Sequence, residues 1–418
     1  MPPPPTHDPA RPPNPALLTD RYELTMLAGA VASGLADRSA VFEVFCRRLP
    51  PGRRFGVVAG QGRLAALLPA LTWGEAELGQ TDFLDPATRD WLRGRTPAPT
   101  VTSYAEGETF FPGSPVLTVE GSFGDGLLLE TLILSVLNHD SAIASAAARM
   151  VLAARGRPLL EMGSRRTHEQ AAVAAARAAW VAGFAGTSNL AAGCAYDLPT
   201  IGTSAHSFVL AHASEAEAFR VQVGTQGVGT TLLVDTYDLL AGVRTAVQVA
   251  GRELGAVRLD SGDLGAQSHQ VRALLDELGA TQTRIVATSD LDEHQIALLA
   301  DDPIDSFGVG TSLVTGSGAP TVGLVYKLVA IEGEDGVLRP VAKRSPGKST
   351  VGGRKWAYRD GDGEQLRPAP GGPGRALQVP LVDDLAAARQ RCADSLAELP
   401  PGARELTPGE PAWTAALP

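Results

Sequence analysis

Cysteine is scarce in this sequence. Among 418 residues only Cys46, Cys194 and Cys392 occur, with wide separations and no CxxC pair. An odd number of cysteines at such spacings argues against a disulfide framework and against a four-thiolate zinc site. A reducing compartment is the simplest setting, so we expect a cytoplasmic protein.

Excess positive charge and long apolar runs are missing as well. The 36 basic residues are outnumbered by 46 acidic ones, which gives a formal net charge of −10. This argues against broad attraction to nucleic acid or to an anionic membrane. The longest strongly apolar stretch, Leu127 to Leu137, contains Glu130 and is too short to span a bilayer. We expect neither partner, although a small anion could bind clustered bases, of which the candidates are Arg165, Arg166, Lys343, Arg344 and Lys348.

The length suggests two or three domains. A proline-rich start without the order of a secretory signal predicts a disordered leader over residues 1–15. An α+β domain is expected over residues 16–125, beginning with a helix over Leu17–Ala32 that Thr19 or Asp20 caps. Residues 331–418 return to sheet-like patterning and are expected to pack with this first domain.

Residues 126–330 are expected to form an α/β domain. A long helix over Gly126–Arg155 is followed by short apolar runs that alternate with helical segments, such as PTIGT before SEAEAFRVQV and VRLD before SHQVRALLDELG. Alternating strands and crossover helices favour a parallel sheet. We prefer an irregular, closed or incomplete α/β barrel to a doubly wound open sheet. Polar residues end nearly every strand, whereas an open sheet concentrates its site at one switch point.

Glycines, carboxylates and hydroxyls gather at these strand ends. Asp235, Asp260, Asp290 and Gly310 follow one another at intervals of 25, 30 and 20 residues, which suit repeated strand–helix units whose loops face one mouth. Glycine lets backbone amides approach phosphate, and carboxylates hold sugar hydroxyls or a metal. The pattern favours a phosphate-sugar site.

Several side chains at this mouth could have either a catalytic or ligand-binding role or a purely structural one. His206 could accept a phosphoryl group, but a loop histidine held by neighbouring hydroxyls is the commoner case. Arg165 and Arg166 could clamp phosphate or carboxylate, or cap surface carboxylates. Arg258 and Asp260 alternate on one strand and so face the same side, either as a structural pair or as a ligand loop.

Two further loops carry weaker signals. Ser289 or Asp290 could cap the helix that follows, and such a cap need not exclude a sugar phosphate. The turn at Gly308, Gly310, Thr311 and Ser312 could surround a phosphate with amides. Neither GxxxxGK[ST] nor a GxGxxG fingerprint occurs at a suitable strand-to-helix junction.

Taken in order, these motifs resemble nicotinate phosphoribosyltransferase. The match rests on TDRYELTM, GSRRTHE, GTSNLAAG, GTSAHSF, RLDSGDL, ATSDLDE, FGVGTSLVTG and KRSPGKSTVGGRKWAYR, which together span nearly the whole chain. The resemblance implies a type II phosphoribosyltransferase: an α/β barrel, a second domain made from both chain ends, and a homodimer whose active sites are shared between subunits.

The resemblance also implies a reaction. Nicotinate, phosphoribosyl pyrophosphate and ATP give nicotinate mononucleotide, pyrophosphate, ADP and phosphate, with Mg²⁺ required and with His206 matching the histidine that ATP phosphorylates. Tyr22, Arg166, Thr203 and Arg258 match nicotinate-binding positions. The positions that match the phosphoribosyl pyrophosphate site are Arg165, Arg258, Asp260, Ser289, Asp290, Gly310, Thr311 and Ser312. Asp260 and Asp290 also match catalytic positions, and either could contact the Mg²⁺ that the substrate phosphates hold.

Selection between related substrates has one sequence signal. Ser188 stands where nicotinamide-using relatives carry an acid, which favours nicotinate. A nicotinamide or quinolinate phosphoribosyltransferase, or a non-catalytic sensor of pyridine nucleotides or sugar phosphates, remains the alternative. The sequence VGGRK replaces an expected proline-glycine before the lysine, which leaves the conformation of the loop from Lys343 to Lys355 open.

Overall fold

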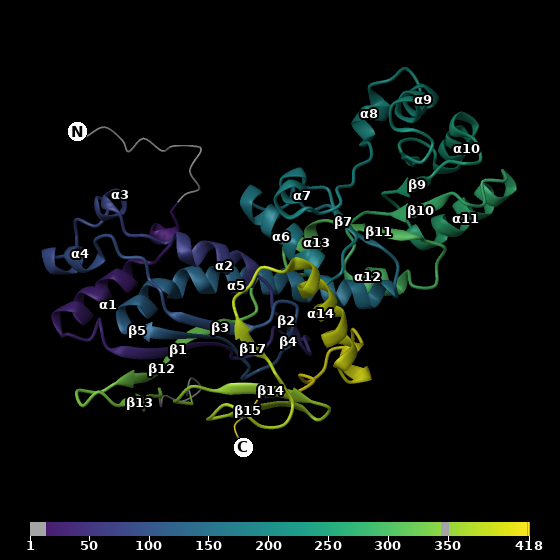
Figure 1. Cartoon of the computed structure of the whole chain (residues 1–418). Helices are drawn as coiled ribbons and strands as arrows, with labels where there is room; N and C mark the ends of the chain where they lie inside the picture. Colours follow the sequence, from purple (N-terminus) through teal and green to yellow (C-terminus); the bar gives the residue numbers. More distant parts are fainter. Residues whose placement is uncertain (1–13, 344–350, 416, 418) are drawn as a thin grey trace. The chain divides into compact units, whose positions relative to one another are not determined.

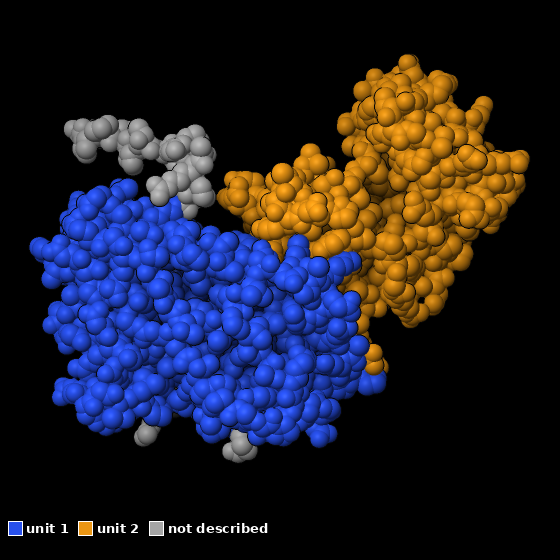
Figure 2. All heavy atoms as spheres, in the orientation of Figure 1, with its two compact units in different colours: residues 1–142, 321–403, 407–418 blue, residues 143–320, 404–406 orange. Residues whose placement is uncertain are grey.

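The computed structural model describes residues 14–343, 351–415 and 417. Most of the predicted leader, and both Arg344 and Lys348, lie outside the described residues. The chain divides into two compact units (Figure 2). Unit 1 comprises Met1–Ala142, Thr321–Ala403 and Thr407–Pro418, and unit 2 comprises Ile143–Pro320 and Arg404–Leu406.

Unit 1 is built on a six-stranded sheet in the order β13-β12-β1-β5-β3-β17. The central strand β1 pairs antiparallel with both β12 and β5, so strands from the two chain ends lie in one sheet. The prediction of an α+β domain made from N- and C-terminal segments is confirmed. The sheet strands are β1 (Ser39–Cys46), β3 (Thr100–Tyr104), β5 (Pro115–Ser122), β12 (Leu324–Glu332), β13 (Leu338–Pro340) and β17 (Gln378–Pro380).

Smaller elements complete this unit (Figure 1). The helices are α1 (Arg21–Ala32), α2 (Gln61–Ala70), α3 (Glu75–Leu78), α4 (Pro86–Leu92) and α14 (Leu385–Glu398), and short 3₁₀ turns are η1 (Pro15–Leu17) and η2 (Pro401–Arg404). The minor strands are β2 (Gly56–Val57), β4 (Thr109–Phe110), β14 (Trp356–Asp360), β15 (Gly363–Arg367) and β16 (Arg375–Ala376). Helix α1 begins after Asp20 without a side-chain cap bond, and the Thr19 hydroxyl donates to the Glu23 carboxylate.

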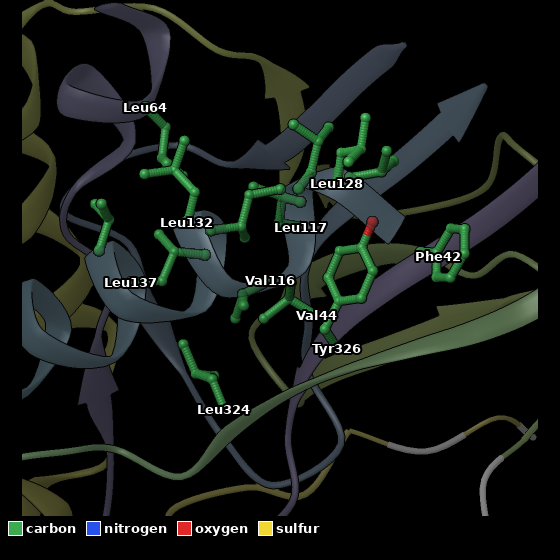
Figure 3. Close-up of a cluster of buried hydrophobic side chains, with 14 of the residues drawn as sticks. Phe42, Val44, Leu64, Val116, Leu117, Leu128, Leu132, Leu137, Leu324 and Tyr326 are labelled. Atoms are coloured by element: carbon green, nitrogen blue, oxygen red, sulfur yellow. The ribbon is translucent and has the colours of Figure 1, made fainter. Parts of the chain in front are cut away.

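The core of unit 1 lies between its sheet and the long helix α5 (Phe123–Ala154). Val44 is paired with Leu117 on one side and with Tyr326 on the other, so one row of side chains crosses three strands on one face (Figure 3). Leu128 and Leu132, one helical turn apart, lie in the same cluster. Helix α5 is long and apolar enough to cross a membrane, yet 67 % of its most apolar window is buried inside the protein, as in a core helix.

Unit 2 contains a curled parallel sheet in the order β7-β6-β11-β10-β9-β8. All five neighbouring pairs are parallel, and the helices that follow the strands are the crossovers expected from the sequence. The sheet does not close, so the prediction of an irregular, incomplete α/β barrel is confirmed. Its strands are β6 (Leu159–Glu161), β7 (Gly186–Thr187), β8 (Thr231–Leu233), β9 (Ala256–Leu259), β10 (Arg284–Ala287) and β11 (Ser306–Val309).

The segment PTIGT is not the strand that the sequence predicts. Only Thr200 forms a bridge, to Thr187. The Thr187 N–H donates to the Pro199 carbonyl at 3.0 Å, and the Ile201 N–H donates to the Thr187 carbonyl at 2.9 Å. Pro199 has no N–H to donate, so the pairing cannot extend on the N-terminal side of this bridge. The helices of this unit are α6 (Glu169–Ala182), α7 (Leu190–Tyr196), α8 (His206–Leu210), α9 (Glu215–Gln226), α10 (Leu239–Ala250), α11 (Leu264–Glu277), α12 (Glu293–Leu298) and α13 (Thr311–Val314).

Candidate active site

The carboxyl ends of the parallel strands in unit 2 bring several of the expected residues together. Asp235 follows β8, Asp260 follows β9, Asp290 follows β10 and Gly310 follows β11. These four strands are direct neighbours in the sheet, so their loops leave from one edge. The sequence intervals therefore reflect a real spatial series.

His206 is the first residue of α8, in the loop region after the Thr200 bridge. Its Nδ1 lies 3.2 Å from the Thr236 hydroxyl. Its Nε2 lies 3.6 Å from an Asp260 oxygen and 3.9 Å from an Asp235 oxygen. The side chain is 40 % exposed, so the imidazole is oriented by polar neighbours and still open to a ligand.

Asp260 connects the histidine to the rest of the site. One carboxylate oxygen accepts from the Thr288 hydroxyl and pairs with the Arg258 guanidinium at 3.1 Å, while the other faces His206. The carboxylate is thus fixed by a neutral donor and a cation. It can balance positive charge on the imidazole or on a sugar carbon.

Arg258 holds the loop that precedes His206. Its guanidinium donates to the Thr288 hydroxyl at 2.9 Å, to the Thr203 hydroxyl at 3.0 Å and to the Ser204 carbonyl at 3.3 Å. The structural pair with Asp260 that the sequence left open is therefore present. The same geometry places Thr203 and Arg258, two expected nicotinate contacts, side by side.

Asp235 is a site residue for which no individual role was predicted from the sequence. Its carboxylate is 5 % exposed, and one oxygen accepts from the Asp260 N–H at 2.9 Å and the Ser261 hydroxyl at 2.8 Å. The other oxygen faces His206 and has no hydrogen-bond partner within the described part of the chain. The sequence feature that indicates Asp235 is its position after a predicted strand, in series with Asp260 and Asp290.

The loop after β10 differs from the expected helix cap. Asp292, rather than Ser289 or Asp290, caps α12, accepting from the N–H groups of His294 and Gln295 at 2.9 and 2.8 Å. The helix starts later in the chain than predicted, because Ser289 has φ of +111° and this conformation turns the backbone out of a helical course. The Asp290 side chain is exposed and forms no hydrogen bond or ion pair with another described residue.

The two glycines near the end of β11, Gly308 and Gly310, have different roles. A Cβ on Gly308 would meet the Met162 sulfur and Thr288 Cγ2 at 2.7 Å, so Gly308 is required for packing. Gly310 begins the short helix α13 without a side-chain cap bond, and Thr311 and Ser312 follow it. The amides of these residues remain the expected phosphate cradle.

Arg165 and Arg166 lie in the loop after β6, and both are exposed. Neither side chain contacts a carboxylate in residues 14–343, 351–415 or 417, so the alternative that they cap surface acids has no support in these segments. Tyr22 lies in unit 1, on α1, and is 46 % exposed. Partial burial and the negative charge of the nearby Glu130 carboxylate raise the pKa of Tyr22 to about 12.

The described residues contain no group of three or more His, Cys, Asp or Glu side chains that could hold a metal by itself. A Mg²⁺ ion would therefore need oxygen ligands from a bound phosphate, which is how this ion commonly binds. The exposed Asp290 carboxylate has the donor type that such an ion takes.

Comparison with known proteins gives consistent matches. The model of the nicotinate phosphoribosyltransferase N-terminal domain matches residues 17–138, and that of the nicotinate phosphoribosyltransferase family matches residues 158–354. The chain is 55 % identical to nicotinate phosphoribosyltransferase pncB1 of Mycobacterium tuberculosis, over 98 % of this chain and 95 % of that protein. It is 31 % identical to the human nicotinate phosphoribosyltransferase, over 95 % and 84 %.

Solved structures agree in fold. The human nicotinic acid phosphoribosyltransferase matches with a TM-score of 0.75 and 27 % identity, over 96 % of this chain and 97 % of that one. Nicotinate-nucleotide pyrophosphorylase from Pyrococcus furiosus matches with a TM-score of 0.75 and 26 % identity, over 92 % and 95 %.

Proposed function

Because this chain belongs to the nicotinate phosphoribosyltransferase family, we propose that it joins nicotinate to phosphoribosyl pyrophosphate in a reaction coupled to ATP hydrolysis. The products are nicotinate mononucleotide, pyrophosphate, ADP and phosphate. The chain is an enzyme of NAD biosynthesis. The main support for coupling to ATP is the contact between the His206 imidazole and the Asp260 carboxylate. This contact lies at the carboxyl ends of the strands, where Arg258 also pairs with Asp260.

In the first half of the reaction His206 attacks the γ-phosphorus of ATP. The N–P bond forms as the bond to ADP breaks. The two carboxylates near Nε2 favour a proton on that nitrogen, which leaves the lone pair on Nδ1 beside the Thr236 hydroxyl. Water later hydrolyses the N–P bond and releases phosphate.

In the second half the pyridine nitrogen of nicotinate attacks the anomeric carbon as pyrophosphate departs. Arg258, Thr203 and Arg166 would bind the nicotinate carboxylate, and Tyr22 would stack on its ring. Asp260 would face the developing positive charge on the sugar. The remaining contacts to the phosphoribosyl group are assigned to Arg165, Ser289, Asp290, Gly310, Thr311 and Ser312.

Magnesium fits this site as a companion of the substrate phosphates. Asp290 or Asp260 would complete its oxygen ligands, and when bound the ion would offset charge on the departing pyrophosphate. A cytoplasmic location is part of the same proposal, since three widely separated, free cysteines suit a reducing compartment.

The direct test is product formation by the purified chain with phosphoribosyl pyrophosphate, Mg²⁺ and either nicotinate, nicotinamide or quinolinate, with and without ATP. We expect nicotinate mononucleotide from nicotinate, with stimulation by ATP. Preference for nicotinamide, or CO₂ release from quinolinate, would assign one of the related transferases. Binding without turnover would indicate a sensor.

Selection for nicotinate gives a prediction at Ser188. In Ser188→Asp, an added carboxylate would oppose the nicotinate carboxylate, and we expect kcat/KM for nicotinate to fall by about 10- to 100-fold because like charges repel in a partly desolvated site. The kcat/KM for nicotinamide should fall much less, because nicotinamide carries no negative charge. Ser188→Asn is the uncharged control, and equal losses for both substrates in Ser188→Asp would remove the residue from substrate selection.

A shared active site gives a prediction at α1. Tyr22 and Met26, four residues apart on one helix face, are 46 % and 41 % exposed, and we propose that a second copy of the chain covers them. Light scattering should give twice the 43.4 kDa chain mass. Met26→Asp should shift it toward a single chain and lower activity, whereas Ala32→Asp, elsewhere on α1, should not. A fully active Met26→Asp monomer would contradict shared sites.

A further inference from the structure

Glu161 is a buried carboxylate that the proposed reaction does not use. It ends β6, is 1 % exposed, and has no cation partner in the segments that the structure describes. One oxygen accepts from the Gly163 N–H at 2.5 Å, and the other accepts from the Thr187 hydroxyl. Burial raises its pKa. Burying such a group is costly unless its hydrogen bonds compensate, so both bonds are significant.

The Thr187 bond fixes the loop after β7. While its hydroxyl donates to Glu161, the same oxygen accepts from the Asn189 N–H at 2.9 Å. The intervening Ser188 N–H donates to the Glu161 carbonyl at 2.8 Å. Ser188 is therefore held by bonds on itself and on both of its neighbours.

The Gly163 bond fixes the loop after β6. The Gly163 carbonyl accepts from the Arg166 N–H at 2.8 Å, so the turn that presents the arginines starts at the residue that Glu161 holds. The two loops also meet directly, because the Asn189 amide donates to the Ser164 hydroxyl at 3.1 Å. One buried carboxylate thus joins the arginine loop to the Ser188 loop.

We propose that Glu161 is a positioning residue for substrate selection, which fixes the arginine loop and Ser188 at the spacing that a pyridine carboxylate requires. This inference rests on the proposed function, which assigns Arg166 and Ser188 to nicotinate. Glu161 does not touch the substrate. It acts through the two loops, so its loss should affect nicotinate binding and leave the chemistry at His206 intact.

Glu161→Gln tests the inference with little change in shape. A carboxylate accepts two bonds, whereas an amide offers one acceptor oxygen and a donor NH₂ group. If the amide oxygen keeps the bond from the Gly163 N–H, the NH₂ group faces the Thr187 hydroxyl, which already accepts from the Asn189 N–H and loses the acceptor for its own proton. We expect KM for nicotinate to rise about tenfold and the preference for nicotinate over nicotinamide to fall by a similar factor. The KM for phosphoribosyl pyrophosphate and the phosphorylation of His206 should stay within about twofold of the parent values.

Four other variants make the result specific. Thr187→Val removes the hydroxyl that links Glu161 to the Ser188 loop and should reproduce the selectivity loss, while Thr187→Ser should restore it. The Glu161→Gln/Thr187→Val double variant should be about as impaired as either single one, because both break one chain of bonds. Asp305→Asn is the control: its carboxylate accepts the Ile285 N–H at 2.7 Å at the opposite end of the sheet, and its substitution should leave selectivity unchanged.

Failure of the inference and failure of the proposed function are distinguishable. If the parent chain makes no nicotinate mononucleotide, the proposed function fails. If the parent chain is active and folded Glu161→Gln keeps the parent selectivity, the inference is overturned. If Glu161→Gln does not fold, Thr187→Val decides, and an unchanged preference for nicotinate in that variant overturns the inference as well.

Discussion

Replacing His206 by alanine is expected to abolish the acid-labile phosphoryl label that ATP leaves on the chain. Without the imidazole beside Asp260 and Thr236 the γ-phosphoryl group has no acceptor, so ATP no longer drives the reaction. We expect the ATP-dependent rate of nicotinate mononucleotide formation to fall by about 10²-fold or more, as when a covalent acceptor is removed. A slow ATP-independent synthesis should survive, since substrate positioning is retained.

The matched control is His212→Ala. His212 lies near the end of the same short segment, where its Nδ1 contacts the Phe208 carbonyl at 2.7 Å, and it has no contact with the strand-end carboxylates. This variant should keep both the label and the ATP stimulation. Persistence of the label in His206→Ala, or its loss in His212→Ala, would contradict the assignment of His206.

Asp260→Asn is expected to lower kcat/KM by about 10²- to 10³-fold without unfolding the protein. The amide oxygen can still accept from Thr288 and Arg258, so the local hydrogen bonds survive. The negative charge that faces His206 is lost. Because preorganised charge stabilises a transition state far more than a neutral dipole does, the loss should appear in catalysis rather than in stability.

The comparison variant for this position is Asp238→Asn. Asp238 caps α10, accepting from the Ala241 N–H at 2.8 Å. Because asparagine caps a helix as well as aspartate does, the same chemical change there removes only a charge near the helix start and should cost about 0.5 kcal/mol of stability and little activity. Thermal unfolding and steady-state kinetics measure the two effects separately. An unchanged kcat/KM in folded Asp260→Asn would remove its proposed role.

Much of the fold of unit 2 could be predicted because its information is local. Each apolar run ending in a polar residue and followed by a helical segment indicates one strand–helix unit, and units of this kind assemble into a parallel sheet. The sequence does not specify that β6 pairs with β11 rather than with a strand nearer in the chain. That pairing, like the insertion of β12 and β17 into the sheet of unit 1, depends on contacts between distant segments.

The expected site residues on β9, β10 and β11 gather at one edge because parallel neighbouring strands end there. Details of the site that depend on the exact course of the backbone cannot be predicted from the sequence. Asp292 rather than Asp290 caps α12 because Ser289 turns the chain, and the unpartnered oxygen of Asp235 is recognisable only when the His206 loop is in place. The joining of two loops by Glu161 likewise requires Thr187, 26 residues away, to come within bonding distance.

The role of His206 as phosphoryl acceptor is best measured by transfer of the phosphoryl group from γ-labelled ATP to the chain, followed by peptide mapping. We expect an acid-labile label on the peptide that contains His206, which disappears when phosphoribosyl pyrophosphate and nicotinate are added. A chain that forms nicotinate mononucleotide with ATP stimulation, yet carries the label elsewhere or not at all, would contradict it.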